Sequence, residues 1–409
     1  MLDSVQSKAN GRVAAANPTE LTISREEELH WLALRLIPGL GARKAGQLLT
    51  RFHTPGAVFR ASRSELEAAG ISGSIAQTIT SGCTFEEAVA QQEAMHATGT
   101  AVIVLSDPRY PARLREIFDP PIVLFARGET SLLNSLMLAV VGTRRPTPYG
   151  MSVAERLAAD LTRAGLTIVS GMARGIDTSA HKGALSANGC TVAVLGCGVD
   201  VVYPSENRKM ADELVEKGLL VSEFPMGTPA FPQNFPIRNR IISGMSAGVV
   251  VVEGAQYSGS SITARLALDQ GREVFAVPGN ITSKMSWGPN LLIKQGAKLV
   301  QDWNDVVNEL SAEDRRLLIG ESRRRLQQQG VFEEDATEAA RQPSLGLEPS
   351  SEICRLILGK LAVDNGTHLD AILEQVEGCS SSEVIAALFE LEMLGAVKQL
   401  PGRNFVKVW

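Results

Sequence analysis

Short apolar runs in the middle of this 409-residue chain restrict its fold more than any other feature. They are rich in valine, isoleucine and leucine, an amphipathic stretch follows each of them, and they cover residues 101–105, 138–141, 167–169, 191–195, 248–252 and 273–277. Strands buried on both faces of a parallel sheet have this continuous apolar character. We therefore predict an α/β fold over residues 100–310, with a Rossmann-like, doubly wound, mostly parallel sheet.

Glycines close most of these runs, at Gly142, Gly171, Gly196, Gly254 and Gly279. In doubly wound sheets, ligands bind outside the carboxyl ends of the strands, near the switch point of the strand order, where helix N-termini face outward. We expect the glycine loops to line one shared crevice.

The N-terminal flank is different. Residues 1–24 are polar and aperiodic, which predicts a disordered arm. Residues 25–95 predict short helices broken at Pro38–Gly41 and Gly70–Gly73, because glycine permits tight turns between paired helices. The first break, followed by Arg43 and Lys44, resembles a helix-hairpin-helix that holds a DNA phosphate, although a purely structural helical bundle explains it equally well.

The C-terminal flank begins with a charged, glutamine-rich stretch, residues 311–350, which we interpret as a linker. Residues 351–409 then predict three amphipathic helices and a β-hairpin, which is the pattern of a winged helix, with Ser380 or Ser381 capping the third helix. That third helix carries Glu383 and Glu390 where a DNA-reading helix would carry arginine or asparagine, which favours a protein-contact role over DNA reading.

The overall composition gives no sign of a nucleic-acid binder, because the formal net charge is −5. Binding depends on the local field instead, and cations gather in the glycine- and proline-rich loops of the middle region: Arg144, Arg145, Arg174, His181, Lys182, Arg208, Lys209, Arg238 and Arg240. The five cysteines are scattered without a CxxC pair, so we expect buried free thiols, no metal and no cofactor. No stretch approaches the roughly 20 apolar residues of a membrane span, and the start of the chain lacks the apolar core of a signal peptide, so we expect a cytoplasmic protein without membrane contact.

The loop after the second run, residues 142–150, occupies the place of a phosphate loop, although it is neither a GxxxxGK[ST] nor a GxGxxG sequence. The amides after Gly142, the Thr143 hydroxyl and the Arg144 guanidinium predict a phosphate site, and Tyr149 is a further candidate. An ordinary strand-to-helix turn is the alternative.

The next loops extend this prediction. Residues 170–185 place Asp177 or Thr178 where either can cap a helix, with His181 four residues past Asp177 on roughly the same face. A catalytic His–Asp pair is the alternative, but no serine or cysteine nucleophile accompanies it. Further along, Phe235 stands beside Arg238 and Arg240. This combination is typical of single-strand binding, in which a ring stacks on an unpaired base and guanidinium groups hold phosphate. An ion pair, for example with Glu253, is the alternative for each arginine. The full set of candidate nucleic-acid-binding residues is Gly142, Thr143, Arg144, Tyr149, Gly171, Ala173, Arg174, Gly175, His181, Asn207, Asn234, Phe235, Arg238, Asn239 and Arg240.

These motifs resemble those of the DprA/Smf family of bacterial DNA-processing proteins. The resemblance rests on residues 141–144, 170–181, 203–207, 235–242, 257–261 and 277–280, and it covers the whole middle domain. The flanks resemble those of members that add an N-terminal helical domain and a C-terminal winged helix. A departure lies at Arg145-Pro146, which alters how a strand leaves the pocket.

The resemblance implies a protein that coats and protects incoming single-stranded DNA during natural transformation, helps load the RecA recombinase, and forms a homodimer through the Rossmann-like domain. It places the phosphate pocket at Gly142, Thr143 and Arg144 with the 171–175 loop, and the base-stacking ring at Phe235. The main rival is a nucleotide phosphoribohydrolase of the same superfamily, but residues 253–261 lack its PGGxGTxxE loop. A transcriptional regulator led by the winged helix is a third possibility.

Overall fold

The computed structural model describes residues 23–256, 258–328, 352–361, 366–376, 379–393, 396–400 and 403–407. The expected arm and the linker after residue 328 lie outside these ranges, apart from the last residues of the arm. The beginning of the expected linker is helical, as α15 (Ala312–Gln328). The chain divides into two compact units, Met1–Gln92 and Glu93–Trp409. No helix among the described residues is both long and apolar enough to cross a membrane.

The first unit consists of short helices, and its sequence explains where they begin. Ser24 and Thr54 accept hydrogen bonds from the first-turn amides of α1 and α3, and Ser62 forms a reciprocal capping box with Glu65 at α4. Gly39 and Gly70 adopt positive φ at the two predicted breaks. The helices are α1 (Arg25–Arg35), α2 (Ala42–Phe52), α3 (Pro55–Arg60), α4 (Arg63–Ala68), α5 (Gly73–Ser81) and the first part of α6 (Phe85–Thr98).

The second unit is built on a sheet in which nine strands of the described chain lie in the order β1-β2-β6-β5-β4-β3-β7-β8-β9. The strands are β1 (Ala101–Val104), β2 (Val123–Gly128), β3 (Met137–Val141), β4 (Thr167–Ser170), β5 (Thr191–Leu195), β6 (Leu219–Ser222), β7 (Gly248–Val251), β8 (Glu273–Ala276) and β9 (Lys298–Leu299). From β6 to β9 every pairing is parallel, whereas β2 is antiparallel to both β1 and β6. The prediction of a doubly wound, mostly parallel sheet is confirmed.

Three strands escaped the prediction. β2 carries Arg127 and ends in Gly128, and β9 is a two-residue edge strand, so both offer a weaker apolar signal than the six predicted runs. β6 (Leu-Leu-Val-Ser) is as long and as apolar as β4, and nothing in its own sequence explains why it was missed.

The order of the strands fixes the switch point. After β3 the chain adds β4, β5 and β6 on one side, and it then returns to add β7, β8 and β9 on the other side. The switch point therefore lies between β3 and β7, where the loops after these strands separate.

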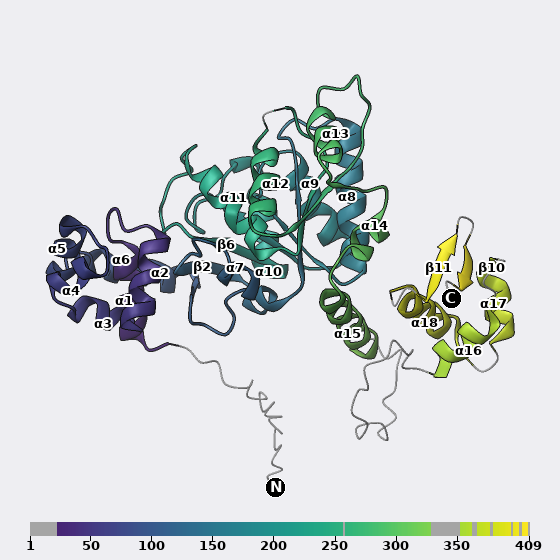
Figure 1. Ribbon diagram of the computed structural model, residues 1–409, viewed down its shortest axis with the longest axis horizontal. Helices are drawn as coiled ribbons and strands as arrows, with labels where there is room; N and C mark the ends of the chain where they lie inside the picture. Colours follow the sequence, from purple (N-terminus) through teal and green to yellow (C-terminus); the bar gives the residue numbers. More distant parts are fainter. Residues whose placement is uncertain are drawn as a thin grey trace, which may run out of the picture. The chain divides into compact units, whose positions relative to one another are not determined.

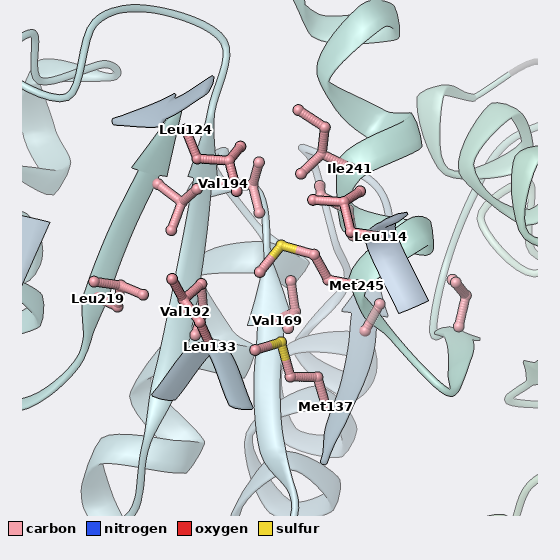
Figure 2. Close-up of a cluster of buried hydrophobic side chains, with 14 of the residues drawn as sticks. Leu114, Leu124, Leu133, Met137, Val169, Val192, Val194, Leu219, Ile241 and Met245 are labelled. Carbon is pink, nitrogen blue, oxygen red and sulfur yellow. The ribbon is translucent and has the colours of Figure 1, made fainter. Parts of the chain in front are cut away.

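Helices cover both faces of the sheet (Figure 1). On one face, α7 (Ala112–Arg115), α11 (Asn234–Met245) and α12 (Gly259–Asp269) pack on a core that includes Leu114, Ile241 and Met245 (Figure 2). On the other face, α8 (Pro148–Arg163), α9 (Ile176–Ser186), α14 (Trp303–Asn308) and α15 pack on a second core. Next to that core, α10 (Arg208–Lys217) covers β5 and β6, after the 3-10 turn Ser205–Asn207. The remaining helical elements are the 3-10 turn Thr130–Asn134 and α13 (Trp287–Lys294).

The C-terminal segment has the predicted winged-helix elements: α16 (Glu352–Lys360), α17 (Leu369–Gln375), α18 (Ser381–Met393), β10 (Thr367–His368), β11 (Val397–Leu400) and β12 (Asn404–Lys407). Its strands form a separate sheet in the order β10-β12-β11, and a cluster that includes Ile357, Ile372 and Leu388 forms its own core. Ser380 caps α18 as expected, since its hydroxyl accepts from the amide of Glu383 while its own amide donates to the Glu383 carboxylate.

Candidate nucleic-acid interface

A crevice of about 480 Å³ opens at the carboxyl edge of the sheet. It is lined by the loops after β3, β4, β5, β6 and β7 and by residues of α11 and α12. Its position at the switch point is the position at which doubly wound sheets bind ligands. Among the predicted site residues it brings together Gly142, Thr143, Arg144, Ala173, Phe235, Arg238 and Asn239.

The loop after β3 is held by a glutamate that the sequence suggested only as an arginine partner. Glu253, 2% exposed, accepts from both the amide (2.8 Å) and the hydroxyl (2.6 Å) of Thr147, the N-cap residue of α8. Its carbonyl also accepts from the amide of Thr143, at 2.7 Å. The negative charge at this helix N-terminus is therefore the protein's own carboxylate, which corrects the expectation that α8 faces a phosphate.

Two glycines let the loops after β3 and β4 touch. A Cβ atom on Gly142 would lie 2.5 Å from Ile176, and one on Gly175 would lie 2.4 Å from the carbonyl oxygen of Thr143. Gly175 also has a φ of 83°, which disfavours other residues. Both glycines allow the two loops that form this wall of the crevice to pack closely against each other.

Asp177 closes the loop after β4 in the same manner. Its Oδ2 accepts from the amides of Gly171 (3.2 Å) and Ala173 (3.3 Å). Burial raises the pKa of this carboxyl above its ordinary value, and the nearby Arg238 opposes that shift. Asp177 therefore ties the loop that precedes α9, and the expectation that it caps the helix is wrong, because the N-cap residue is Gly175, which makes no side-chain capping bond.

Arg238 forms the floor of the crevice. It is 3% exposed, and its Nη1 donates to the carbonyl of Gly171 at 2.7 Å and also to that of Val194. Its Nε donates to Oδ1 of Asn239 at 3.1 Å. Burial lowers the pKa of Arg238 to about 10. Arg238 therefore joins the ends of β4 and β5. Because the side chain is buried, its charge acts on a ligand in the crevice through the floor and not by exposed contact.

The aromatic centre of the crevice is Phe235, in the first turn of α11. The Arg144 guanidinium carbon lies 5.0 Å from the centroid of the Phe235 ring, which is cation–π geometry. The Tyr203 ring lies 5.4 Å from the same ring and is tilted by 33°. Gly196 makes room for this arrangement, because a Cβ atom there would lie 2.8 Å from the Phe235 ring.

Several predicted contacts lie beneath the surface. His181 is fully buried and its Nδ1 is hydrogen-bonded to Oγ1 of Thr191 at 2.7 Å, so the structure does not bring it to the crevice. The amides of Asn207 and Asn234 donate to the carbonyls of Met172 and Gly196. These three side chains hold loops in place because their polar atoms face the protein.

Arg240 and Tyr149 also differ from expectation. Arg240, 8% exposed, pairs with Glu223 at 2.7 Å and with Asp119 at 3.1 Å, so the ion-pair alternative is correct but its partner is not Glu253. Tyr149 is half exposed, and its hydroxyl donates to the carbonyl of Pro278 at 2.9 Å. Neither residue lines the crevice.

The prediction missed one wall of the crevice, the N-terminus of α12. Ser258, Gly259 and Ser260 line it, and the Ser258 hydroxyl lies 2.7 Å from that of Ser260. Hydroxyl groups rather than a carboxylate face the crevice here, which suits an anionic ligand. The serine-rich run after the fifth predicted strand was the available signal, although Tyr257 in that run lies outside the described residues.

The fold and the crevice define a Rossmann-like α/β protein with a ligand site at its switch point. Comparison with known proteins makes this more specific. Residues 101–311 match the family model described as DNA recombination-mediator protein A, and residues 339–403 match that of the DprA winged helix domain.

Individual relatives agree with the family models. The chain is 46% identical over 213 residues to DNA processing protein DprA of Bacillus subtilis, covering 52% of this chain and 72% of that protein. It is 41% identical over 298 residues to protein Smf of Escherichia coli, covering 72% of this chain and 74% of the relative. The X-ray structure of DNA processing protein A from Streptococcus pneumoniae superimposes with a TM-score of 0.58 at 34% identity, covering 69% of this chain and 98% of that structure. This chain belongs to the DprA/Smf family of DNA-processing proteins.

Proposed function

We propose that this protein binds single-stranded DNA in the crevice at the switch point. The observation that carries the proposal is the pairing of Arg144 with the Phe235 ring, at 5.0 Å, above a floor of positive charge from Arg238. Single strands are bound by a ring that stacks on an unpaired base next to cations that hold phosphate. A phosphate draws Arg144 away from the ring, and a base then takes its place.

The α12 end of the crevice supplies a second phosphate contact in this proposal. The hydroxyls of Ser258 and Ser260 and the helix N-terminus line the crevice after β7, the strand next to β3. Helix N-termini favour anions because their amides and their dipole both point toward the ligand. A backbone-directed mode of this kind carries no base preference.

The wider role follows from family membership. We infer that the protein protects incoming single-stranded DNA during natural transformation, helps to load the RecA recombinase onto it, acts as a homodimer in the cytoplasm, and performs no reaction of its own. Relatives named as DNA processing proteins support the DNA-processing part of this role.

A gel-shift titration tests the proposal, with single- and double-stranded DNA of one length at two salt concentrations. The wild type should prefer the single strand, and its affinity should fall as salt rises. Phe235→Ala should weaken binding by about 5- to 150-fold, since a base stack contributes about 1–3 kcal/mol. Arg144→Ala should weaken all sequences equally.

Matched controls are available on the surface. Phe231 is an exposed aromatic in the loop between β6 and α11, and Arg163 is an exposed arginine at the C-terminal end of α8; neither side chain lines the crevice. Phe231→Ala and Arg163→Ala should bind as the wild type does. If the wild type fails to bind, or if Phe235→Ala and Arg144→Ala bind normally, the crevice holds a different ligand. Sequence-dependent binding to the duplex would instead support a transcriptional regulator.

The phosphoribohydrolase alternative requires a carboxylate free to act on a bound nucleotide. Glu253 is committed to Thr147, and Asp177 is committed to two backbone amides. Incubation with nucleoside monophosphates should therefore release no base. Release that Asp177→Asn abolishes would establish the enzyme and overturn the binding proposal.

A further inference from the structure

A second hollow adjoins the crevice and carries more exposed positive charge than the crevice does. Its volume is about 300 Å³, and it is lined by Arg144, Arg145, Ala173, Arg174, Tyr203 and Pro204. Half of these six residues are arginines. Arg144, Ala173 and Tyr203 also line the crevice, so the two hollows share a wall.

Tyr203 stands in that shared wall. Its side chain is 43% exposed, although it also contacts the Phe235 ring at 5.4 Å. A half-exposed ring beside a second ring extends the stacking surface from one hollow toward the other. The mechanism proposed for the crevice gives Tyr203 no role.

Arg174 lines the second hollow and forms an ion pair with Glu206. Its Nε lies 2.7 Å from Oε1 of Glu206, and the two side chains are 60% and 53% exposed. An ion pair with this much exposure contributes little stability, because water screens it. The Glu206 carboxylate nevertheless occupies the edge of the Arg174 guanidinium that a phosphate would use.

We propose that the second hollow binds the next phosphodiester and base of the same single strand, and that Glu206 competes with the strand for Arg174. The Tyr203 ring stacks on the second base, while Arg145 and Arg174 hold the phosphate between the two bases. The strand displaces Glu206 from Arg174 as it enters. This inference rests on the proposed function of the crevice and extends the bound strand by one base and one phosphate.

The proposal makes an unusual prediction, since removing an acidic side chain at this place should strengthen binding. Glu206→Gln frees Arg174 without removing a cation, and we expect affinity for an oligothymidylate of about 12 nucleotides to rise about 2- to 5-fold. Fluorescence anisotropy at two salt concentrations measures it. Glu213→Gln is the matched control, because Glu213 forms a similarly exposed ion pair with Lys217 on α10 and lines neither hollow.

A second pair of variants tests the ring. Tyr203→Leu retains apolar contact with Phe235 but removes the stacking surface, and we expect affinity to fall about tenfold. Tyr203→Phe keeps the ring and should bind as the wild type does. Arg145→Gln should reduce the slope of log affinity against log salt by about 0.7, the value for one phosphate contact of a single strand.

The outcomes separate this inference from the proposed function. If the wild type does not bind single strands, the proposed function fails. If the wild type binds and Phe235→Ala weakens it, but Glu206→Gln matches Glu213→Gln and Tyr203→Leu is normal, the crevice is the site and the second hollow is not. Weaker binding by Glu206→Gln would also overturn the inference, because Glu206 would then orient Arg174 toward the strand.

Discussion

Arg240 shows how little a residue's identity says about its role. It sits two residues from Arg238 in α11, yet Glu223 and Asp119 neutralise it inside the protein. Its Nη2 donates to both carboxylate oxygens of Glu223 at 2.7 Å, while its Nε faces Asp119. The exposed cations near the crevice are Arg144, Arg145 and Arg174.

His181 provides a pH-dependent test at the same scale. Burial lowers its pKa from 6.5 to about 3, so the folded protein holds the ring neutral while the unfolded chain takes up a proton below about pH 6.5. Stability is therefore present above pH 6.5 and is lost as pH falls toward 3, by at most about 1.4 kcal/mol per pH unit.

Urea unfolding at about pH 7.5 and about pH 5.5 measures this effect. His181→Asn removes the titrating ring and should lose less stability between the two pH values than the wild type loses. Comparison of the two proteins removes the contribution of Asp177, whose raised pKa acts in the opposite direction. Equal losses in the two proteins would show that His181 is not held neutral.

At the scale of elements, the crevice depends on loops that buried carboxylates hold in place. Glu253 binds Thr147, the N-cap residue of α8, and Asp177 ties the loop before α9, whereas α12 presents serines. The two carboxylates fix the loops that carry Arg144 and Ala173, so the anchoring residues stabilise the site without touching a ligand. Only α12 of these three leaves a serine-lined end toward the crevice among the described residues.

Glu253→Gln tests whether an anchoring carboxylate stabilises the site without touching a ligand. Glutamine offers one acceptor oxygen where two donors of Thr147 now bind the carboxylate, so one donor loses its partner and stability should fall by about 1–3 kcal/mol. Single-strand affinity should also fall, since the loop that carries Arg144 loosens. Thermal unfolding and gel shift measure the two effects.

A control for this variant lies at the opposite edge of the sheet. Glu129 accepts from the amide of Ser131 just beyond Gly128, which pairs with the first residue of β6. Glu129→Gln should leave DNA binding unchanged. Normal binding by Glu253→Gln would mean that the loop keeps its shape without the carboxylate.

At the scale of the whole molecule, an acidic chain concentrates positive charge beside the crevice. The formal net charge of −5 coexists with an arginine-lined hollow beside the crevice. Local field rather than net charge attracts a polyanion, and acidic surface elsewhere discourages nonspecific contact.

The N-terminal unit carries a second candidate for phosphate. Arg43 and Lys44 are exposed in the first turn of α2, after the N-cap residue Gly41, which offers no side-chain cap. Cations at this end oppose the helix dipole. Arg43→Glu with Lys44→Glu should weaken single-strand binding and reduce the salt slope by about 1.4, the value for two phosphates. Unchanged affinity and slope would leave a purely structural helical bundle.

The sequence by itself determined the sheet, the edge that carries the site and the winged-helix elements. Buried parallel strands must be continuously apolar, and their carboxyl ends must share one edge, so six runs and their closing glycines were enough to predict a crevice at this edge with Gly142 in it. Phe235 is expected there because two arginines stand beside it and because the family resemblance implies it. Capping is equally local, as the reciprocal bonds of Ser380 and Glu383 show.

Only the tertiary structure decided which polar residues face the ligand and which face the protein. The contacts that bury His181, Arg238, Arg240 and Glu253 join segments 10 to 106 residues apart, and nothing in the local sequence specifies which carbonyl or carboxylate will meet a given side chain. The short strand β6 and the edge strand β9 depend in the same way on their neighbours in the sheet. Periodicity and capping act over a few residues, whereas the pairing of buried charges is settled by packing across the whole sheet.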